Sequence, residues 1–154
     1  MSSVEQKIAE LGLTLPETSK PLAAYIPAVQ TGNLVFTSGQ LPMVDGKLTH
    51  TGKVGAEVSV EQAKALAEVC ALNALAAIKM VIGDLDKIKR VVKVVGFVAS
   101  APDFSSQPAV VNGASELLGA VLGDKGIHAR SALGVAVLPL DAPVEVELIV
   151  EISQ

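Results

Sequence analysis

Apolar residues recur at helical spacing in two long stretches of the chain. From Val60 to Ile82 they return every three or four positions, and Gly83 follows as a stop signal. A second stretch runs from about Pro108 to Leu122, where proline suits the first helical turn and Gly123 suits the end. The pattern predicts two main helices, of which the first is about 34 Å long.

The N-terminus carries the signals of a short helix. Ser3 and Gln6 have the spacing of a capping box, and Gly12 follows about two turns later. Three prolines then interrupt the chain before residue 28 and prevent a regular helix. We therefore expect one domain over residues 1–154, in which residues 1–20 form an N-terminal extension with one short helix.

Strand-like segments alternate with these helices. The segment Ala28–Ser38 predicts a hairpin, whereas Leu41–Lys53 predicts a loop or an exposed edge strand with little power to form core. The nearly continuous β-branched run Val91–Val98 is typical of a central strand covered on both faces. The last segment, Val144–Ile152, alternates apolar residues with carboxylates. This order predicts an α+β fold with one mixed β-sheet and two main helices on one face.

Composition bears on the sheet face that the helices leave uncovered. Half of the 154 residues are apolar and only 18 % are charged, below the roughly 25 % that is usual in soluble domains. Aromatic residues make up only 3 % of the chain, so an interface would consist of valine, alanine and leucine, as in obligate oligomers. We therefore expect the second face of the sheet to meet water or another subunit of a homo-oligomer.

Charge and cysteine content exclude several classes of partner. The formal net charge is −4 and basic residues do not cluster, which makes nucleic acid an unlikely partner. No apolar run reaches the roughly 18 residues of a membrane span, so we expect no membrane association. Cys70 is the only cysteine, and the N-terminus lacks the pattern of a secretory signal. These features predict a cytoplasmic protein.

Motifs for metal, nucleotide or nucleophilic chemistry are absent from the sequence. His50, His128 and Cys70 are far apart, and no metal-binding or acyl-enzyme spacing occurs. Gly52-Lys53 lacks the serine or threonine that a phosphate loop needs. We therefore predict neither a metal nor a cofactor, and we assign no catalytic role to His50, expected in a solvated loop, or to His128, expected in a turn.

Arg130 is the strongest candidate for ligand binding. The strand that follows it alternates, so that Arg130 shares a face with the small residues Ala132, Gly134 and Ala136. Small neighbours leave room for a ligand or a second surface beside the guanidinium, whose forked donors match a carboxylate. Glu145 is expected on a neighbouring strand. Arg130 is then either an anion clamp or one half of a surface or interface ion pair.

Three further side chains are ambiguous when each is considered alone. Tyr25, the only tyrosine, either plugs the sheet edge or offers its hydroxyl to a ligand. Asn112 lies in an apolar stretch of the second main helix, where it is an interface residue or a ligand contact. Glu145 is most simply a solvated carboxylate on a strand.

Several motifs together resemble the RidA (YjgF) family of enamine/imine deaminases. They occur in the family's order from about residue 20 onward, and they are Gly32–Pro42, Asp103-Phe104, Asn112, Ala129-Arg130-Ser131, Leu138-Pro139 and Val144–Glu147. The resemblance implies a chorismate-mutase-like (YjgF) fold and a homotrimer whose sheets face inward. It also implies three sites in the clefts between subunits.

The resemblance further implies the hydrolysis of reactive 2-imino or enamine acids to 2-oxo acids and ammonia. Arg130 would hold the carboxylate of a small-molecule substrate, and Glu145 would position the attacking water. The residues that would line the cleft are Tyr25, Ser38, Gly39, Asn112 and the backbone of Ala132. A protonated imine is already electrophilic, so positioning and one acid/base group suffice without metal or cofactor.

Two segments depart from the family's pattern. The family's Gly-Pro-Tyr-Ser-Gln-Ala is replaced by the residues 23–28, and its frequent Cys and Glu after the arginine are Ala132 and Gly134. These changes indicate a subgroup with an altered pocket wall. Two other functions stay open: the endoribonuclease activity attached to some family members, which needs phosphate-binding cations, and non-catalytic binding of small carboxylates by a regulatory protein, which would tolerate loss of Glu145.

Overall fold

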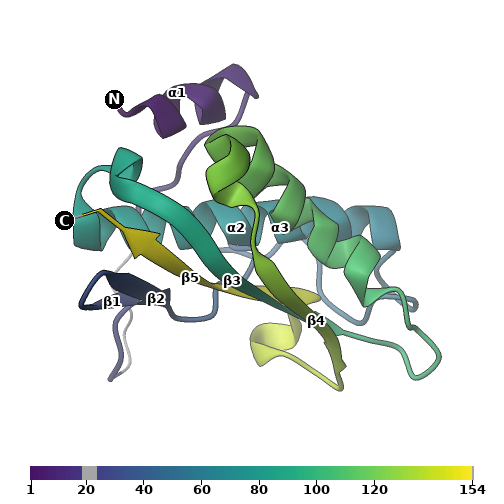
Figure 1. Ribbon diagram of the computed structural model, residues 1–154. Coiled ribbons are helices and arrows are strands. Elements are labelled where there is room, and N and C mark those ends of the chain that lie inside the picture. The colour runs from purple at the N-terminus through teal and green to yellow at the C-terminus, as the bar shows by residue number, and fades with distance from the viewer. Residues whose placement is uncertain (19–23, 154) are drawn as a thin grey trace.

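A single mixed sheet of five strands organises the computed structural model, which describes residues 1–18 and 24–153 (Figure 1). The strand order is β1-β2-β5-β3-β4, and every pair is antiparallel except β3 and β4. The strands are β1 (Ala28–Thr31), β2 (Leu34–Thr37), β3 (Ile88–Ala99), β4 (Ala129–Val135) and β5 (Val144–Ile152). Three short 3₁₀ helices connect them: η1 (Leu85–Lys87), η2 (Gly123–Gly126) and η3 (Pro139–Asp141).

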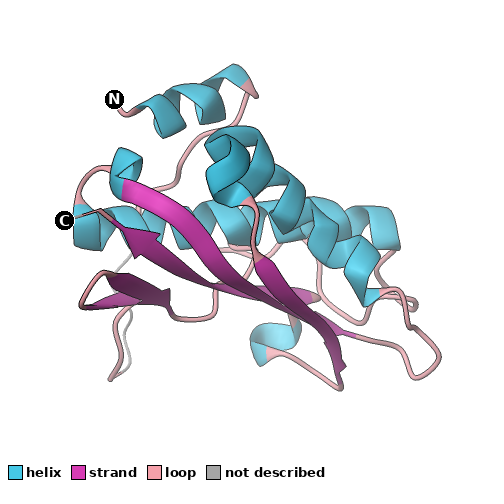
Figure 2. Cartoon of the chain, in the orientation of Figure 1, coloured by secondary structure: helices cyan, strands magenta, loops and turns pink. Residues whose placement is uncertain are grey.

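Two long helices, α2 (Val60–Ile82) and α3 (Gln107–Leu122), lie side by side on the same side of the strands (Figure 2). A capping box starts α2, because Ser59 Oγ accepts from the Gln62 N–H at 3.1 Å and Gln62 Oε1 accepts from the Ser59 N–H at 3.0 Å. Gly83, at φ 80°, ends it. The predicted architecture of one mixed sheet with both main helices on one face is confirmed.

The short N-terminal helix α1 (Ser3–Glu10) is confirmed as well, but its cap differs from the prediction. Ser2 caps the helix by accepting from the Glu5 N–H, whereas the predicted cap, Ser3, donates its N–H and its hydroxyl to Asp86 at 2.8 and 2.9 Å. These bonds, and one from the Val4 N–H, hold the pKa of the Asp86 carboxyl below its usual value. Residues 19–20 of the predicted extension, and Ala23 of the departing segment, lie outside the described residues.

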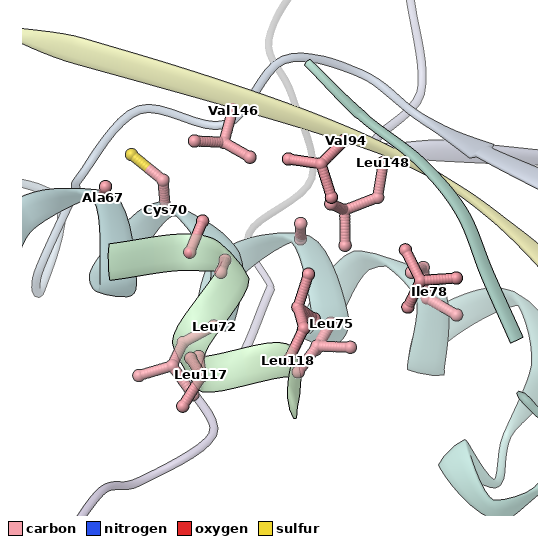
Figure 3. Packing of buried hydrophobic residues seen from close by; sticks show 14 of the residues in the cluster. Ala67, Cys70, Leu72, Leu75, Ile78, Val94, Leu117, Leu118, Val146 and Leu148 are labelled. Atoms are coloured by element: carbon pink, nitrogen blue, oxygen red, sulfur yellow. The ribbon is translucent and has the colours of Figure 1, made fainter. Parts of the chain in front are cut away.

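The main core lies between α2, α3 and the sheet (Figure 3). One buried cluster joins Cys70, Leu75 and Ile78 of α2 to Leu118 of α3, Val94 of β3 and Leu148 of β5, and Leu75 lies beside Leu118. By length and composition α2 is long and apolar enough to cross a membrane, although the sequence contains no uninterrupted apolar run of that length. About 61 % of its most apolar stretch is buried inside the protein, which is the behaviour of a core helix.

Glycines allow α3 to approach its neighbours closely. A Cβ added to Gly113 would lie 2.9 Å from the carbonyl carbon of Lys64 in α2. A Cβ added to Gly96 of β3 would lie 2.7 Å from Val111 Cγ1. Both distances are shorter than side-chain contacts permit, so these two positions set the separation of α3 from α2 and from the sheet.

The other face of the sheet is open in the single chain. Val94 and Val98 of β3 are fully buried, whereas Val92 is exposed and Phe97 is only half-buried. The prediction that the central strand is covered on both faces is therefore wrong for one chain, because both helices lie on the same side. Apolar residues of four strands remain accessible on the open face: Val29, Phe36, Val92 and Leu133.

The loop of residues 41–53 contributes more packing than its sequence predicted. It has one isolated bridge, between Val44 and Lys47, and no regular strand. Leu41 and Leu48 pack against a small second cluster that Ala99, Leu138 and Ala142 form. The side-chain amide of Asn73 in α2 donates to the carbonyls of Leu41 and Met43, which ties the loop to the helix layer.

Gly113→Ala is expected to lower the free energy of unfolding by about 1–3 kcal/mol, because the new methyl group collides with the backbone of α2. Gly119→Ala in the same helix is the matched control: no atom lies within 4 Å of its Cβ position, so the change should be neutral or stabilise by up to about 1 kcal/mol. Chemical denaturation at one protein concentration measures both. Equal effects of the two substitutions would contradict the role of Gly113.

Candidate functional site

Arg130 lies on the edge strand β4 and points toward the helix layer. Its partner across the sheet is Val94, which is buried beneath the helices, and paired residues share a face. The guanidinium Nη1 donates to Asn112 Oδ1 at 2.8 Å and to Ser115 Oγ at 3.1 Å. Arg130 therefore lies on the predicted face of small residues, and within the chain this face is covered by α3.

These two bonds determine which edge of Arg130 is available to a ligand. Nη1 carries two hydrogens, and Asn112 and Ser115 accept both. Among the described residues, Nε and Nη2 have no hydrogen-bond partner. A carboxylate can therefore form two parallel hydrogen bonds only along the Nε–Nη2 edge.

The sequence did not single out Ser115, and it gave His128 no role in a site. His128 lies between η2 and β4, where its Nε2 is 2.9 Å from Ser115 Oγ and its Nδ1 is 2.6 Å from the carbonyl of Gly126. Ser115 follows Asn112 by three positions, so both project from the same side of α3. That spacing was the available signal, but only the fold brings His128 to the same place.

Glu145 lies on the opposite face of the sheet. It pairs with Phe97 of β3 on the open face, between the buried residues Val144 and Val146. Gln40 forms two backbone hydrogen bonds with Val146, which places Gly39 directly against the Glu145 side chain. A Cβ on Gly39 would lie 2.8 Å from the carboxyl carbon of Glu145.

The surroundings of Glu145 raise the pKa of its carboxyl group. Partial burial raises the pKa of its carboxyl above the usual value, and the negative charge of Glu147 raises it further. A carboxyl group whose pKa is moved toward neutrality is better suited to accept and return a proton at physiological pH. The environment of Glu145 is therefore one in which acid/base chemistry is possible.

Ser38 directly precedes Gly39, whereas Tyr25 lines a surface pocket with Ala77, Met80 and Val81 of α2. Ser38 Oγ donates to the carbonyl of Ile26 at 2.6 Å, which anchors the segment that carries Tyr25. Tyr25 is 58 % exposed, so within one chain its ring does not plug the sheet edge. Ala132, by contrast, is half-buried against the main core, on the side of Arg130.

The prediction that Arg130 and Glu145 lie on neighbouring strands is wrong. Strand β3 lies between β4 and β5, and the two side chains project from opposite faces. The chain thus presents two separate groups. We call Arg130, Asn112, Ser115, His128 and Ala132 the arginine half-site, and Glu145, Gly39 and Ser38 the glutamate half-site.

Other reactive side chains lie outside both half-sites. Burial raises the pKa of the Cys70 thiol well above its usual value, with a further contribution from Glu145, which keeps this buried thiol in its less nucleophilic, protonated form. His50 Nδ1 lies 3.0 Å from Thr49 Oγ1 in the 41–53 loop. Across residues 1–18 and 24–153, no three histidine, cysteine or acidic side chains gather as metal ligands.

Residues 5–152 match the model of a family described as "YjgF/chorismate_mutase-like, putative endoribonuclease". A Trypanosoma cruzi protein named TCP17 is 42 % identical over 151 residues, which are 97 % of this chain and 94 % of that protein. The 2-iminobutanoate/2-iminopropanoate deaminase of Escherichia coli K12 is 34 % identical over 128 residues, which are 83 % of this chain and 87 % of that enzyme.

The fold is also similar to that of solved structures. The crystal structure of the Agrobacterium tumefaciens protein Atu1372, described as having unknown function, superimposes with a TM-score of 0.93 at 51 % sequence identity. The match covers 98 % of this chain and 93 % of that one, so it includes both half-sites. Together with the family match, this similarity confirms the predicted chorismate-mutase-like fold.

Gly39→Ala is expected to leave the fold intact and to displace the Glu145 carboxylate, because the new Cβ occupies the place of that flexible side chain. If Glu145 acts in a reaction, the variant should lose at least about tenfold in kcat/KM at nearly unchanged stability. Thermal unfolding and steady-state kinetics check the two parts. Full activity in this variant would show that the position of Glu145 is unimportant.

Proposed function

The chain belongs to the YjgF/chorismate mutase-like family, and on that premise we propose that it hydrolyses 2-imino acids at a site built from two copies of the chain. The observation that carries the proposal is the separation of the half-sites. Arg130 presents one free guanidinium edge on the helix side, and Glu145 presents a partly buried carboxyl group on the open face. The arginine half-site supplies a cation that can bind a carboxylate, and the glutamate half-site supplies an acid/base group.

The chemistry assigns one role to each half-site. The Nε–Nη2 edge of Arg130 binds the carboxylate of the 2-imino acid and thereby fixes the imine carbon. Glu145 takes a proton from water as the water oxygen bonds to that carbon, and it returns the proton to the nitrogen. Glu145 then takes the remaining hydroxyl proton, so that the C=O bond forms as the carbon–nitrogen bond breaks and ammonia leaves, and the products are ammonia and a 2-oxo acid.

A closed ring of three chains would bring the half-sites together. When the arginine half-site of one copy meets the glutamate half-site of the next, the interface is heterologous, and a rotation that closes the ring gives equivalent sites. The open sheet face supplies the apolar surface for such an assembly, through Phe36, Val92 and Leu133 among others. We therefore propose a homotrimer with three sites between its subunits.

The curated relatives support this reaction more directly than RNA cleavage. Proteins about one-third identical to this chain are named 2-iminobutanoate/2-iminopropanoate deaminases, whereas the family description mentions an endoribonuclease. The chain carries 16 acidic residues against 12 basic ones, which disfavours a polyphosphate backbone. Arg130 is suited to one carboxylate, because only one of its edges is free.

Arg130→Ala is expected to lower kcat/KM at least about 100-fold, because the substrate loses a bidentate, charge-assisted contact. The assay follows ammonia and 2-oxo acid release from 2-iminobutyrate that an amino-acid oxidase generates, with semicarbazide as the competing trap. Arg90→Ala is the matched control, since Arg90 is the only other arginine and lies exposed on β3. Its activity should equal that of the wild type.

The result has three distinguishable outcomes. Acceleration by the wild type and Arg90→Ala, but not by Arg130→Ala of the same oligomeric size, supports the proposed reaction. Acceleration that survives Arg130→Ala contradicts the role of Arg130. Stabilisation of the wild type by a 2-oxo acid without any turnover identifies a non-catalytic carboxylate binder instead.

Mixed oligomers test whether the two half-sites belong to different chains. Arg130→Ala and Glu145→Gln should each be inactive alone, but co-refolding them in equal amounts should restore about one quarter of the wild-type activity. Each restored site combines an intact Arg130 from one chain with an intact Glu145 from another. Turnover at the level of the separate variants, in oligomers shown to be mixed by mass spectrometry, would place the whole site within one chain.

A further inference from the structure

Behind Arg130, the side chains of Ser115 and His128 form a hydrogen-bonded chain that the proposed reaction does not use. We propose that His128 is a positioning residue: acting through Ser115, it holds the guanidinium of Arg130 in the orientation that receives the substrate carboxylate. The inference deepens the proposed function, and it rests on Arg130 being the carboxylate anchor.

With a neutral imidazole, the direction of each hydrogen bond in this network follows from the two groups at its ends, the Gly126 carbonyl and the Arg130 guanidinium. The Gly126 carbonyl can only accept, so His128 Nδ1 donates to it and carries the proton of the neutral ring. The guanidinium can only donate, so Ser115 Oγ accepts from Arg130 Nη1. The Ser115 hydroxyl is then free to donate to His128 Nε2, which accepts.

His128 gives the Ser115 hydroxyl its orientation. A serine hydroxyl within a helix can donate to the carbonyl four residues earlier, which here is that of Val111. His128 Nε2 draws this proton away from the helix at 2.9 Å, and a lone pair of the oxygen faces Arg130. With Asn112 as the second acceptor, Nη1 is held at two points, and the plane of the guanidinium is fixed.

The position of His128 is itself determined by a close backbone contact. A Cβ added to Gly126 would lie 2.7 Å from the carbonyl carbon of Leu118 and 3.0 Å from the amide nitrogen of Gly119. Gly126 therefore packs directly on α3, and its carbonyl is in place to accept from the imidazole. Helix α3 thus supports this hydrogen-bonded network at two points, through the Ser115 side chain and through its backbone contact with Gly126.

Two substitutions of His128 separate its hydrogen bonds. Glutamine can place an amide oxygen where Nε2 lies and can still accept from Ser115, whereas asparagine reaches only the position of Nδ1. His128→Asn and Ser115→Ala should each raise KM for 2-iminobutyrate about five- to tenfold, with kcat within about twofold, since they weaken carboxylate binding equally in ground and transition state. His128→Gln should restore KM to within about twofold of the wild type.

Equilibrium binding provides a readout that is independent of turnover. Calorimetric titration with 2-oxobutyrate should give a Kd that rises about five- to tenfold in His128→Asn and in Ser115→Ala. The double variant should bind no more weakly than either single variant, because both remove the same chain of bonds. A role limited to stability would instead lower Tm and kcat together, and glutamine would not restore KM.

The outcomes separate this inference from the proposed function. A wild type that neither binds 2-oxobutyrate nor hydrolyses 2-iminobutyrate overturns the role of Arg130, and the inference with it. Binding that depends on Arg130 but is unchanged in His128→Asn and Ser115→Ala overturns the positioning role alone. Additive losses in the double variant also contradict it, because His128 would then act without Ser115.

Discussion

The close packing of α3 against β3 and α2 is the constraint on which the site depends. Gly113 and Gly96 remove the side chains that would otherwise hold these elements apart. At this separation Asn112 and Ser115 reach Arg130 on the edge strand. The close contact of Gly126 with α3 places His128 beside Ser115. The close backbone contacts at these three glycines therefore determine both the packing of the core and the position of the side chains around Arg130.

The position of β3 between β4 and β5 keeps the two half-sites apart within one chain. It separates Arg130 from Glu145 by one strand and by the thickness of the sheet. Because the two side chains lie on opposite faces of one sheet, we propose that a second copy of the chain completes a site that uses them together. The same open face that exposes Glu145 also exposes the apolar residues for such an assembly.

The two half-sites also differ in electrostatic character. Arg130 shares its Nη1 hydrogens between two neutral acceptors, which orient the guanidinium without neutralising its charge. Within the described residues Glu145 forms no salt bridge, and burial together with Glu147 raises the pKa of its carboxyl group. A carboxylate ligand would thus meet an uncompensated positive charge at Arg130, whereas the pKa of the Glu145 carboxyl group is shifted upward, toward the range of a general acid or base.

By itself the sequence determined the elements and the candidate residues. Periodicity predicted α2, α3 and the strands, because spacing along the chain reflects local geometry, and the motifs indicated Arg130, Asn112, Gly39 and Glu145. Only the tertiary structure decided the strand order, the opposite faces of Arg130 and Glu145, and the meeting of Ser115 with His128. These depend on contacts between segments far apart in the chain, and no local pattern of residues encodes such contacts.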